Sequence, residues 1–120
     1  MKNDTLVLGA SLKEERYSNM AIKKLRTHNI STKAVGLIEG EVVGVKILKG
    51  KPDFKTIETV TLYLNAKRQK DYYSYIIALK PKRVIFNPGT ENSEFMEMLK
   101  QNNIAFEVAC TLTLLATNQY

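Results

Sequence analysis

The sequence predicts an α/β protein with a small, doubly wound sheet of five mainly parallel strands. Short stretches rich in Val, Ile and Leu alternate along the 120 residues with longer segments in which apolar residues recur at helical spacing. This alternation favours a parallel sheet with right-handed crossovers and helices on both faces. We expect the first strand to lie near the centre of the sheet.

The first half of the chain should supply two strands, one helix and one extended segment. Thr5–Leu8 is a short apolar run, and Ser18–His28 follows it with apolar residues on one face and basic residues on the other. Thr32–Val35 is a second apolar run. Residues 39–48 (EGEVVGVKIL) alternate around Gly44, which predicts a short extended excursion on the surface.

The second half should supply three strands and two helices. Thr59–Leu64 (TVTLYL) reads as a strand, and Asn65 is a plausible cap for a helix over Lys67–Leu79, which Pro81 ends. Apolar runs and helical spacing then predict a strand at Arg83–Phe86, a helix at Ser93–Asn102 and a strand at Ala105–Ala109.

Length and composition indicate a single globular domain over residues 1–120. The chain has the usual size of one domain, and its 44% hydrophobic and 25% charged residues are typical of proteins that fold around a core. No apolar run approaches the ~20 residues that span a bilayer, and the amino terminus shows no secretory apolar region. We therefore expect a cytoplasmic protein with no membrane partner.

In a doubly wound sheet, ligands bind outside the carboxyl ends of the strands, so the residues just after each strand should meet at one edge. Hydroxyls, amides and an arginine converge there. These residues are Gly9-Ala10-Ser11, Gly36-Leu37-Ile38, Asn65-Ala66-Lys67-Arg68, Asn87-Pro88-Gly89-Thr90 and Cys110-Thr111-Leu112.

This edge lacks the residues that several chemistries require. A phosphorelay receiver would need an aspartate where the chain has Asn65, and a hydride-transfer dinucleotide domain would show GxGxxG and an acidic residue after the second strand. No Ser, His and Asp set and no pair of carboxylates lines the edge. A lone Cys110 and a lone His28 predict neither an internal disulfide nor a metal site. We expect a binding protein rather than an enzyme.

The first turn has the features of an anion site. Backbone N–H groups after Gly9 and at the start of the following helix point outward with the positive end of the helix dipole, and Ser11 and Ser18 add hydroxyl donors. Lys13 and Arg16 lie between them and could close over phosphate oxygens. We expect a pyrophosphate here, and we expect that a side chain at position 9 would occupy the space it needs.

Four patches, taken in order, resemble the small stand-alone CoA-binding proteins, whose Rossmann-like domain is similar to the CoA-binding domain of succinyl-CoA synthetase. The patches are LVLGAS with the following RYS, the segment around Gly44, the NPGT of residues 87–90, and Cys110 with Leu112. The resemblance covers nearly the whole chain. It implies that CoA or an acyl-CoA is the ligand, and that a short member of the family has no established reaction.

The resemblance also implies where the ligand lies. It places the pyrophosphate at Gly9, Ala10 and Ser11, flanked by Lys13, Arg16, Tyr17 and Ser18, the nucleotide or pantetheine beside Asn65 and Arg68, and the pantetheine end along Asn87, Pro88 and Gly89. Gly36 and Cys110 complete the expected site. The chain departs from the family at Gly36-Leu37, where relatives often have Asn-Pro, and at Arg68, which is shifted along the chain.

Several alternatives stay open. The net charge of +6 favours anionic partners in general, yet we do not expect nucleic acid, because the chain has no aromatic-rich strand motif or recognition helix. Another nucleotide could take the place of CoA. A protein-interaction module is the other alternative, in which Tyr72 and Tyr73 form a homodimer or bind a partner. At the end of a buried strand, Cys110 is more often a small apolar residue than a group that faces a ligand.

Overall fold

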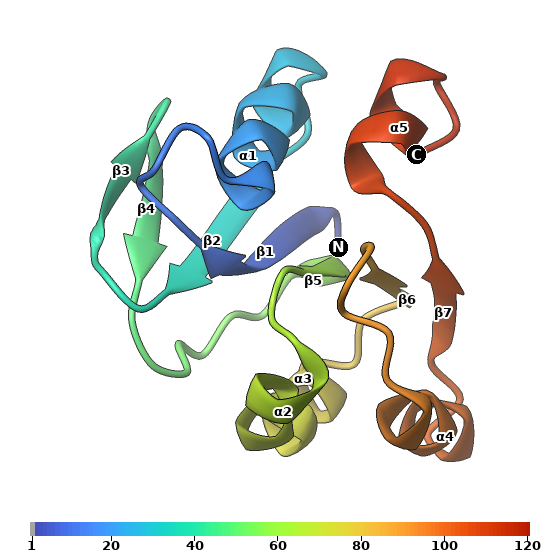
Figure 1. Ribbon diagram of the computed structural model, residues 1–120. Coiled ribbons are helices and arrows are strands. Elements are labelled where there is room, and N and C mark those ends of the chain that lie inside the picture. The colour runs from blue at the N-terminus through green and yellow to red at the C-terminus, as the bar shows by residue number, and fades with distance from the viewer. Residues whose placement is uncertain (1) are drawn as a thin grey trace.

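The computed structural model describes residues 2–120 and shows a seven-stranded sheet with helices on both faces (Figure 1). The strands lie in the order β3-β4-β2-β1-β5-β6-β7, and only the β3–β4 pair is antiparallel. The α/β, mainly parallel architecture and the central first strand are as predicted. The seven strands are β1 Asp4–Ala10, β2 Thr32–Gly36, β3 Gly40–Val42, β4 Val45–Leu48, β5 Ile57–Leu62, β6 Arg83–Phe86 and β7 Ala105–Val108.

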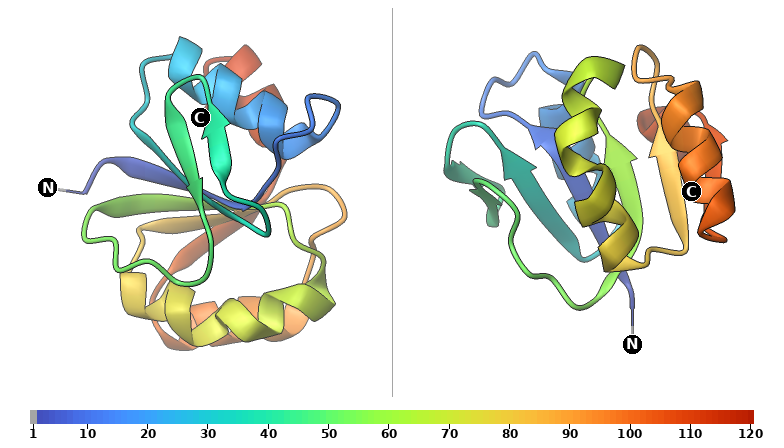
Figure 2. Two further views of the ribbon diagram at one scale, coloured as in Figure 1. Left: turned by 90° about the vertical axis from the view of Figure 1, so that its left-hand side faces the viewer. Right: turned by 90° about the horizontal axis from the view of Figure 1, so that it is seen from below.

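The helices form one layer on each side of the sheet. Two of them, α1 (Tyr17–Thr27) and α5 (Thr111–Ala116), cover one face. The other face carries α2 (Ala66–Gln69), a 3₁₀ turn η1 (Lys70–Tyr72), α3 (Tyr73–Leu79) and α4 (Ser93–Gln101), as Figures 1 and 2 show. No helix within residues 2–120 is long and apolar enough to cross a membrane.

The prediction of five strands is wrong, because residues 39–48 are not a surface excursion. They form the β3–β4 hairpin, and β4 pairs in parallel with β2 at the edge of the sheet. Val42, Val45 and Ile47 are at most 6% exposed and pack in the same cluster as Ile22 of α1. Burial of these three side chains stabilises the hairpin as part of the sheet.

The predicted helix Lys67–Leu79 is divided into α2, η1 and α3. Gln69 is fully buried, and its side-chain amide donates to the carbonyl oxygens of Leu64 at 2.8 Å and Thr90 at 2.7 Å. At the other end of the run, Tyr73 and Ile76 pack into the core. Residues 70–72 join these two anchored segments in a tighter turn.

Each face of the sheet buries its own apolar cluster. On β1, Leu6 and Leu8 belong to the cluster beneath α3 and α4, whereas Val7 packs with α1 and α5. Phe95 stacks on Tyr73 in the first cluster, with ring centroids 4.5 Å apart. Because both faces are covered, the central strands carry continuous apolar runs rather than alternating ones.

Gly9 allows the end of β1 to approach the main chain that follows β5. Its φ is +100°, and a Cβ at this position would lie 2.9 Å from the backbone C and O of Tyr63. A side chain at position 9 would therefore meet the protein's own backbone. This corrects the expectation that such a side chain would occupy phosphate space.

Asn87 links three elements beneath the carboxyl edge of the sheet. Its side-chain nitrogen donates to Thr61 Oγ1 at 2.7 Å and to the Leu62 carbonyl at 2.8 Å, and its side-chain oxygen accepts the Thr111 N–H at 2.8 Å. Thr111 is the first residue of α5, a helix that the sequence did not predict. Asn87, 2% exposed, thus joins β5 and β6 to α5.

We expect Gly9→Ala to lower the free energy of unfolding by about 1–3 kcal/mol more than Gly44→Ala, because only the first side chain is forced against backbone. Gly44 is the matched control, since its φ of +83° is equally unfavourable for alanine but a Cβ there meets nothing within 4 Å. Urea unfolding measures both values. Equal losses would show that the Gly9–Tyr63 contact relaxes at no cost.

We expect Asn87→Ala to cost about 3 kcal/mol, because it leaves the Thr111 N–H and the Leu62 carbonyl buried with a hydrogen bond missing. Asn102→Ala is the control, because that exposed side chain donates only to the Met98 carbonyl; it should change stability by no more than about 0.5 kcal/mol. Denaturant unfolding of the two variants tests the difference. A loss below ~1 kcal/mol for Asn87→Ala would contradict the role of Asn87 as a link.

Candidate functional site

A cavity of about 550 Å³ lies at the carboxyl edge of the sheet. It is walled by the loops that follow β2, β1, β5 and β6, which are four neighbouring strands. Eleven of the fourteen residues expected at the site line it. They are Gly9 and Ala10 at the end of β1, Ser11, Lys13 and Arg16 in the loop that follows, Tyr17 and Ser18 at the start of α1, Asn65 and Arg68 after β5, and Pro88 and Gly89 after β6.

The other three expected residues do not line this cavity. Gly36 lines a smaller, adjoining cavity of about 150 Å³, and a Cβ there would lie 2.3 Å from the Ala10 carbonyl oxygen. Both side-chain hydrogens of Asn87 are taken up by β5. Cys110 is half-buried at the start of α5.

Six residues of the cavity wall were not among the fourteen assigned to the site from the sequence. Leu37, Ile38 and Thr90 directly follow residues that were assigned to the site. Their position just after a strand could therefore have indicated that they line the cavity. Tyr63 and Leu64 were assigned to a strand that ends two residues earlier, at Leu62. The remaining residue is Leu12, in the loop between β1 and α1.

Hydrogen bonds hold the β1–α1 loop in a compact form. Ser11 Oγ accepts the Lys13 N–H at 3.1 Å, and the Arg16 N–H donates to the Lys13 carbonyl at 3.1 Å. Asn19, which is 1% exposed, donates from its side-chain nitrogen to the Ser11 carbonyl at 2.9 Å. The last bond ties the loop to the first turn of α1, so the loop and the helix N-terminus keep a common position.

The N-terminus of α1 offers free donors to the cavity. Its capping residue, Arg16, makes no side-chain cap, and no acidic residue lies in the first turn. Within residues 2–120, the backbone N–H groups of Tyr17 and Ser18 have no acceptor, and the Ser18 hydroxyl makes no hydrogen bond. Free N–H groups at the positive end of a helix dipole favour an anion.

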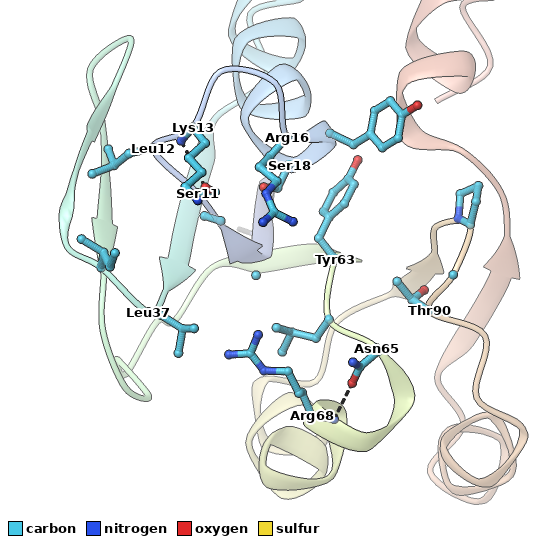
Figure 3. A pocket seen from close by; sticks show the side chains of 17 residues that line it. Ser11, Leu12, Lys13, Arg16, Ser18, Leu37, Tyr63, Asn65, Arg68 and Thr90 are labelled. Atoms are coloured by element: carbon cyan, nitrogen blue, oxygen red, sulfur yellow. Dashed lines mark hydrogen bonds between the residues drawn. The ribbon is translucent and has the colours of Figure 1, made fainter.

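The charge in the cavity is entirely positive. Lys13, Arg16 and Arg68 line it together with no Asp or Glu, and none of the three is in an ion pair within residues 2–120. The nearby Glu14 pairs instead with Lys23 of α1, at 3.6 Å. Figure 3 shows Arg16 and Arg68 entering the cavity from opposite sides. Three uncompensated cations in one cavity raise the local potential for anions.

The wall opposite α1 is fixed by a helix cap. Asn65 Oδ1 accepts the Arg68 N–H at 2.9 Å, which caps α2 and leaves the Asn65 side-chain nitrogen unused within residues 2–120 (Figure 3). Arg68 also lines the smaller cavity, whose wall includes Asp71. No ion pair joins Arg68 to Asp71 in the described chain.

Two titratable side chains near the cavity have shifted pKa values. Burial raises the pKa of Tyr63 to about 12, with the hydroxyls of Thr111 and Thr61 opposing the shift, so Tyr63 keeps its proton at neutral pH. Burial also acts to raise the pKa of Cys110. Hydrogen bonds from the hydroxyl and N–H of Thr113 and from the Leu112 N–H outweigh that effect, and the net shift is downward.

Comparisons with known proteins agree with this architecture. An uncharacterised protein of known crystal structure is 42% identical with a TM-score of 0.95, over 100% of this chain and 99% of that chain. A hypothetical protein from Pyrococcus horikoshii OT3 is 27% identical with a TM-score of 0.83, over 93% and 80%. A protein from Thermus thermophilus shares the fold at 21% identity, with a TM-score of 0.86 over 99% and 91%.

Comparison with curated proteins finds no match. The comparison with protein families does: a model described as a CoA-binding domain matches residues 3–116, which include every residue of the cavity. The family predicted from the four sequence patches is therefore confirmed. The chain belongs to the family of CoA-binding domains.

Proposed function

We propose that this chain binds CoA or an acyl-CoA in the 550 Å³ cavity, with the diphosphate at the start of α1. The observation that carries this proposal is the set of unsatisfied donors in the wall. Lys13, Arg16 and the free N–H groups of Tyr17 and Ser18 lie together without a carboxylate. Charge-assisted hydrogen bonds to phosphate oxygens would satisfy all of them at once.

The order of the loops supports an extended ligand with the diphosphate in its middle. The loop after β1 lies between the loop after β2 on one side and those after β5 and β6 on the other. CoA likewise has its diphosphate between an adenosine and a pantetheine arm. We assign the adenosine to the β2 side, where Leu37 and Ile38 are 66% and 69% exposed and offer apolar surface to a purine ring.

The pantetheine arm then runs toward the loops after β5 and β6. The unused side-chain nitrogen of Asn65 is a donor for an amide carbonyl of the arm, and Pro88 and Gly89 form the wall beyond it. Buried groups under these loops, Gln69 and Asn87, hold them in place and do not face the cavity.

The lining favours binding over chemistry. Its residues include no His, Asp, Glu or Cys, and Tyr63 with its raised pKa is a hydrogen-bond donor rather than a base at neutral pH. A general acid or base would need a group that titrates near the working pH. We therefore propose a non-catalytic binding protein whose CoA-bound state is read by another component, as in a regulatory role.

We expect Arg16→Gln to weaken CoA binding by at least about tenfold, because it removes a charge-assisted contact to the diphosphate. Lys24→Gln removes the same charge from an exposed position on α1 outside the cavity and should leave the affinity within about twofold of wild type. Isothermal titration with CoA measures all three proteins, and far-UV circular dichroism checks that the variants fold.

A wild-type protein that releases no heat with millimolar CoA or acyl-CoA would overturn the proposed function. Equal losses in Arg16→Gln and Lys24→Gln would show instead that net charge, and not the start of α1, attracts the ligand. Native mass spectrometry of the purified protein gives an independent check: a bound mass equal to that of CoA or an acyl-CoA supports the proposal.

A further inference from the structure

Two guanidinium groups enter the cavity from opposite walls. Arg16 comes from the start of α1 and Arg68 from α2, and both side chains are directed into the same space (Figure 3). Neither has a carboxylate partner within residues 2–120. Both side chains are exposed to water, which screens their mutual repulsion, and they leave two cations in the cavity that no carboxylate neutralises.

One diphosphate at the start of α1 does not account for both walls. Lys13, Arg16 and the N–H groups of Tyr17 and Ser18 already match its charge and its acceptor oxygens on the α1 side. Arg68 lies across the cavity and has no such group to bind. A second anionic group on the same ligand would pair with it.

We infer that Arg68 binds a phosphate monoester on the ribose of the nucleotide, which is the 3′-phosphate if the ligand is CoA. This inference rests on the proposed function for the identity of the ligand. Arg68 is then the residue with which the site distinguishes a phosphorylated ribose from a plain one. A planar guanidinium suits this task, because it donates two parallel hydrogen bonds to phosphate oxygens.

The position of Arg68 agrees with the ribose side of the cavity. Besides the main cavity, Arg68 lines the smaller one together with Gly9 near the end of β1, Gly36 at the end of β2 and Leu37 just after it. These strands bound the side to which the adenosine is assigned. Asp71 lines the smaller cavity but not the main one, and its carboxylate would repel a phosphate, so the favourable place for the phosphate is the side of Arg68 that faces the main cavity.

The backbone of Arg68 is held firmly although its side chain is exposed. Its N–H is bound by Asn65 Oδ1 at 2.9 Å, and the next residue, Gln69, bonds to two separate loops at 2.8 and 2.7 Å. A fixed starting point reduces the conformational freedom that the long side chain loses on binding.

The test compares CoA with dephospho-CoA, which differs only in the 3′-phosphate, by titration calorimetry on four proteins. We expect wild type to bind CoA at least about tenfold more tightly than dephospho-CoA. Arg68→Gln should reduce this ratio to about one, mainly by weakening CoA, whereas Arg16→Gln should weaken both ligands alike. Lys67→Gln, the same charge change at the neighbouring exposed residue outside the cavity, should keep the wild-type ratio.

The outcomes separate this inference from the proposed function. If both ligands bind wild type equally, or if Arg68→Gln keeps the preference for CoA, the inference is overturned while CoA binding stands. If neither ligand binds, the proposed function fails. In that case a parallel titration with NADP and NAD tests whether the site recognises a ribose phosphate on another nucleotide. A preference for NADP that Arg68→Gln removes would support the phosphate subsite. No binding of either nucleotide would overturn the inference as well.

Discussion

The close approach of backbone at the carboxyl end of β1 fixes where the loops after β1, β2 and β5 leave the sheet. Gly9 lies against the main chain of Tyr63, and one residue later Ala10 lies against Gly36, where a Cβ would be 2.3 Å from a carbonyl oxygen. Through these two contacts the central strand draws the ends of β5 and β2 together. The loop that leaves β1 therefore emerges between the other two, with α1 beginning directly above the gap.

Two polar layers with different hydrogen bonding lie at this edge of the sheet. The layer beneath the cavity is polar but fully paired, because Asn87, Gln69 and Thr90 exchange hydrogen bonds with one another's loops and with β5. The layer that faces the cavity is polar and unpaired, with cations and free N–H groups. Satisfied buried groups give a rigid base. The unsatisfied cations above it are in contact with water and would exchange that contact for an anionic ligand.

The fold class could be predicted from the sequence because it depends on local patterns: apolar runs for strands, helical spacing for helices, and turns after the strands. The strand count could not, because the segment around Gly44 has the same alternation whether it lies free on the surface or pairs with β2. Burial of Val42, Val45 and Ile47 favours the paired form. These side chains are buried in a cluster with residues of α1, which is distant in sequence. The short helix α5 depends in the same way on a bond from Asn87 to Thr111, 24 residues away.

The wall residues show a similar division. The β1–α1 loop was predictable since its members are close in sequence, from Gly9 to Ser18. Asn87 was expected to face a ligand because it follows a strand, but residues after strands can point either outward or beneath the edge, and sequence does not tell the two apart. Its side chain points beneath, toward Thr61 and Thr111. Tyr63 was not assigned to the site, because it continues the apolar pattern of the preceding strand and was counted as part of it.

The bridging role of Gln69 has a kinetic consequence. Because one side chain binds carbonyls in the loops after β5 and β6 at once, and is fully buried, neither loop can open without breaking buried bonds. The β1–α1 loop is held by a bond between Ser11 and Lys13 that is exposed to water and by a part-buried bond from Asn19 to the Ser11 carbonyl. Exposed bonds of this kind break and re-form more readily than buried ones. Entry to the cavity and departure from it would therefore depend on this loop and on the loop after β2, with the loops after β5 and β6 acting as a stationary frame.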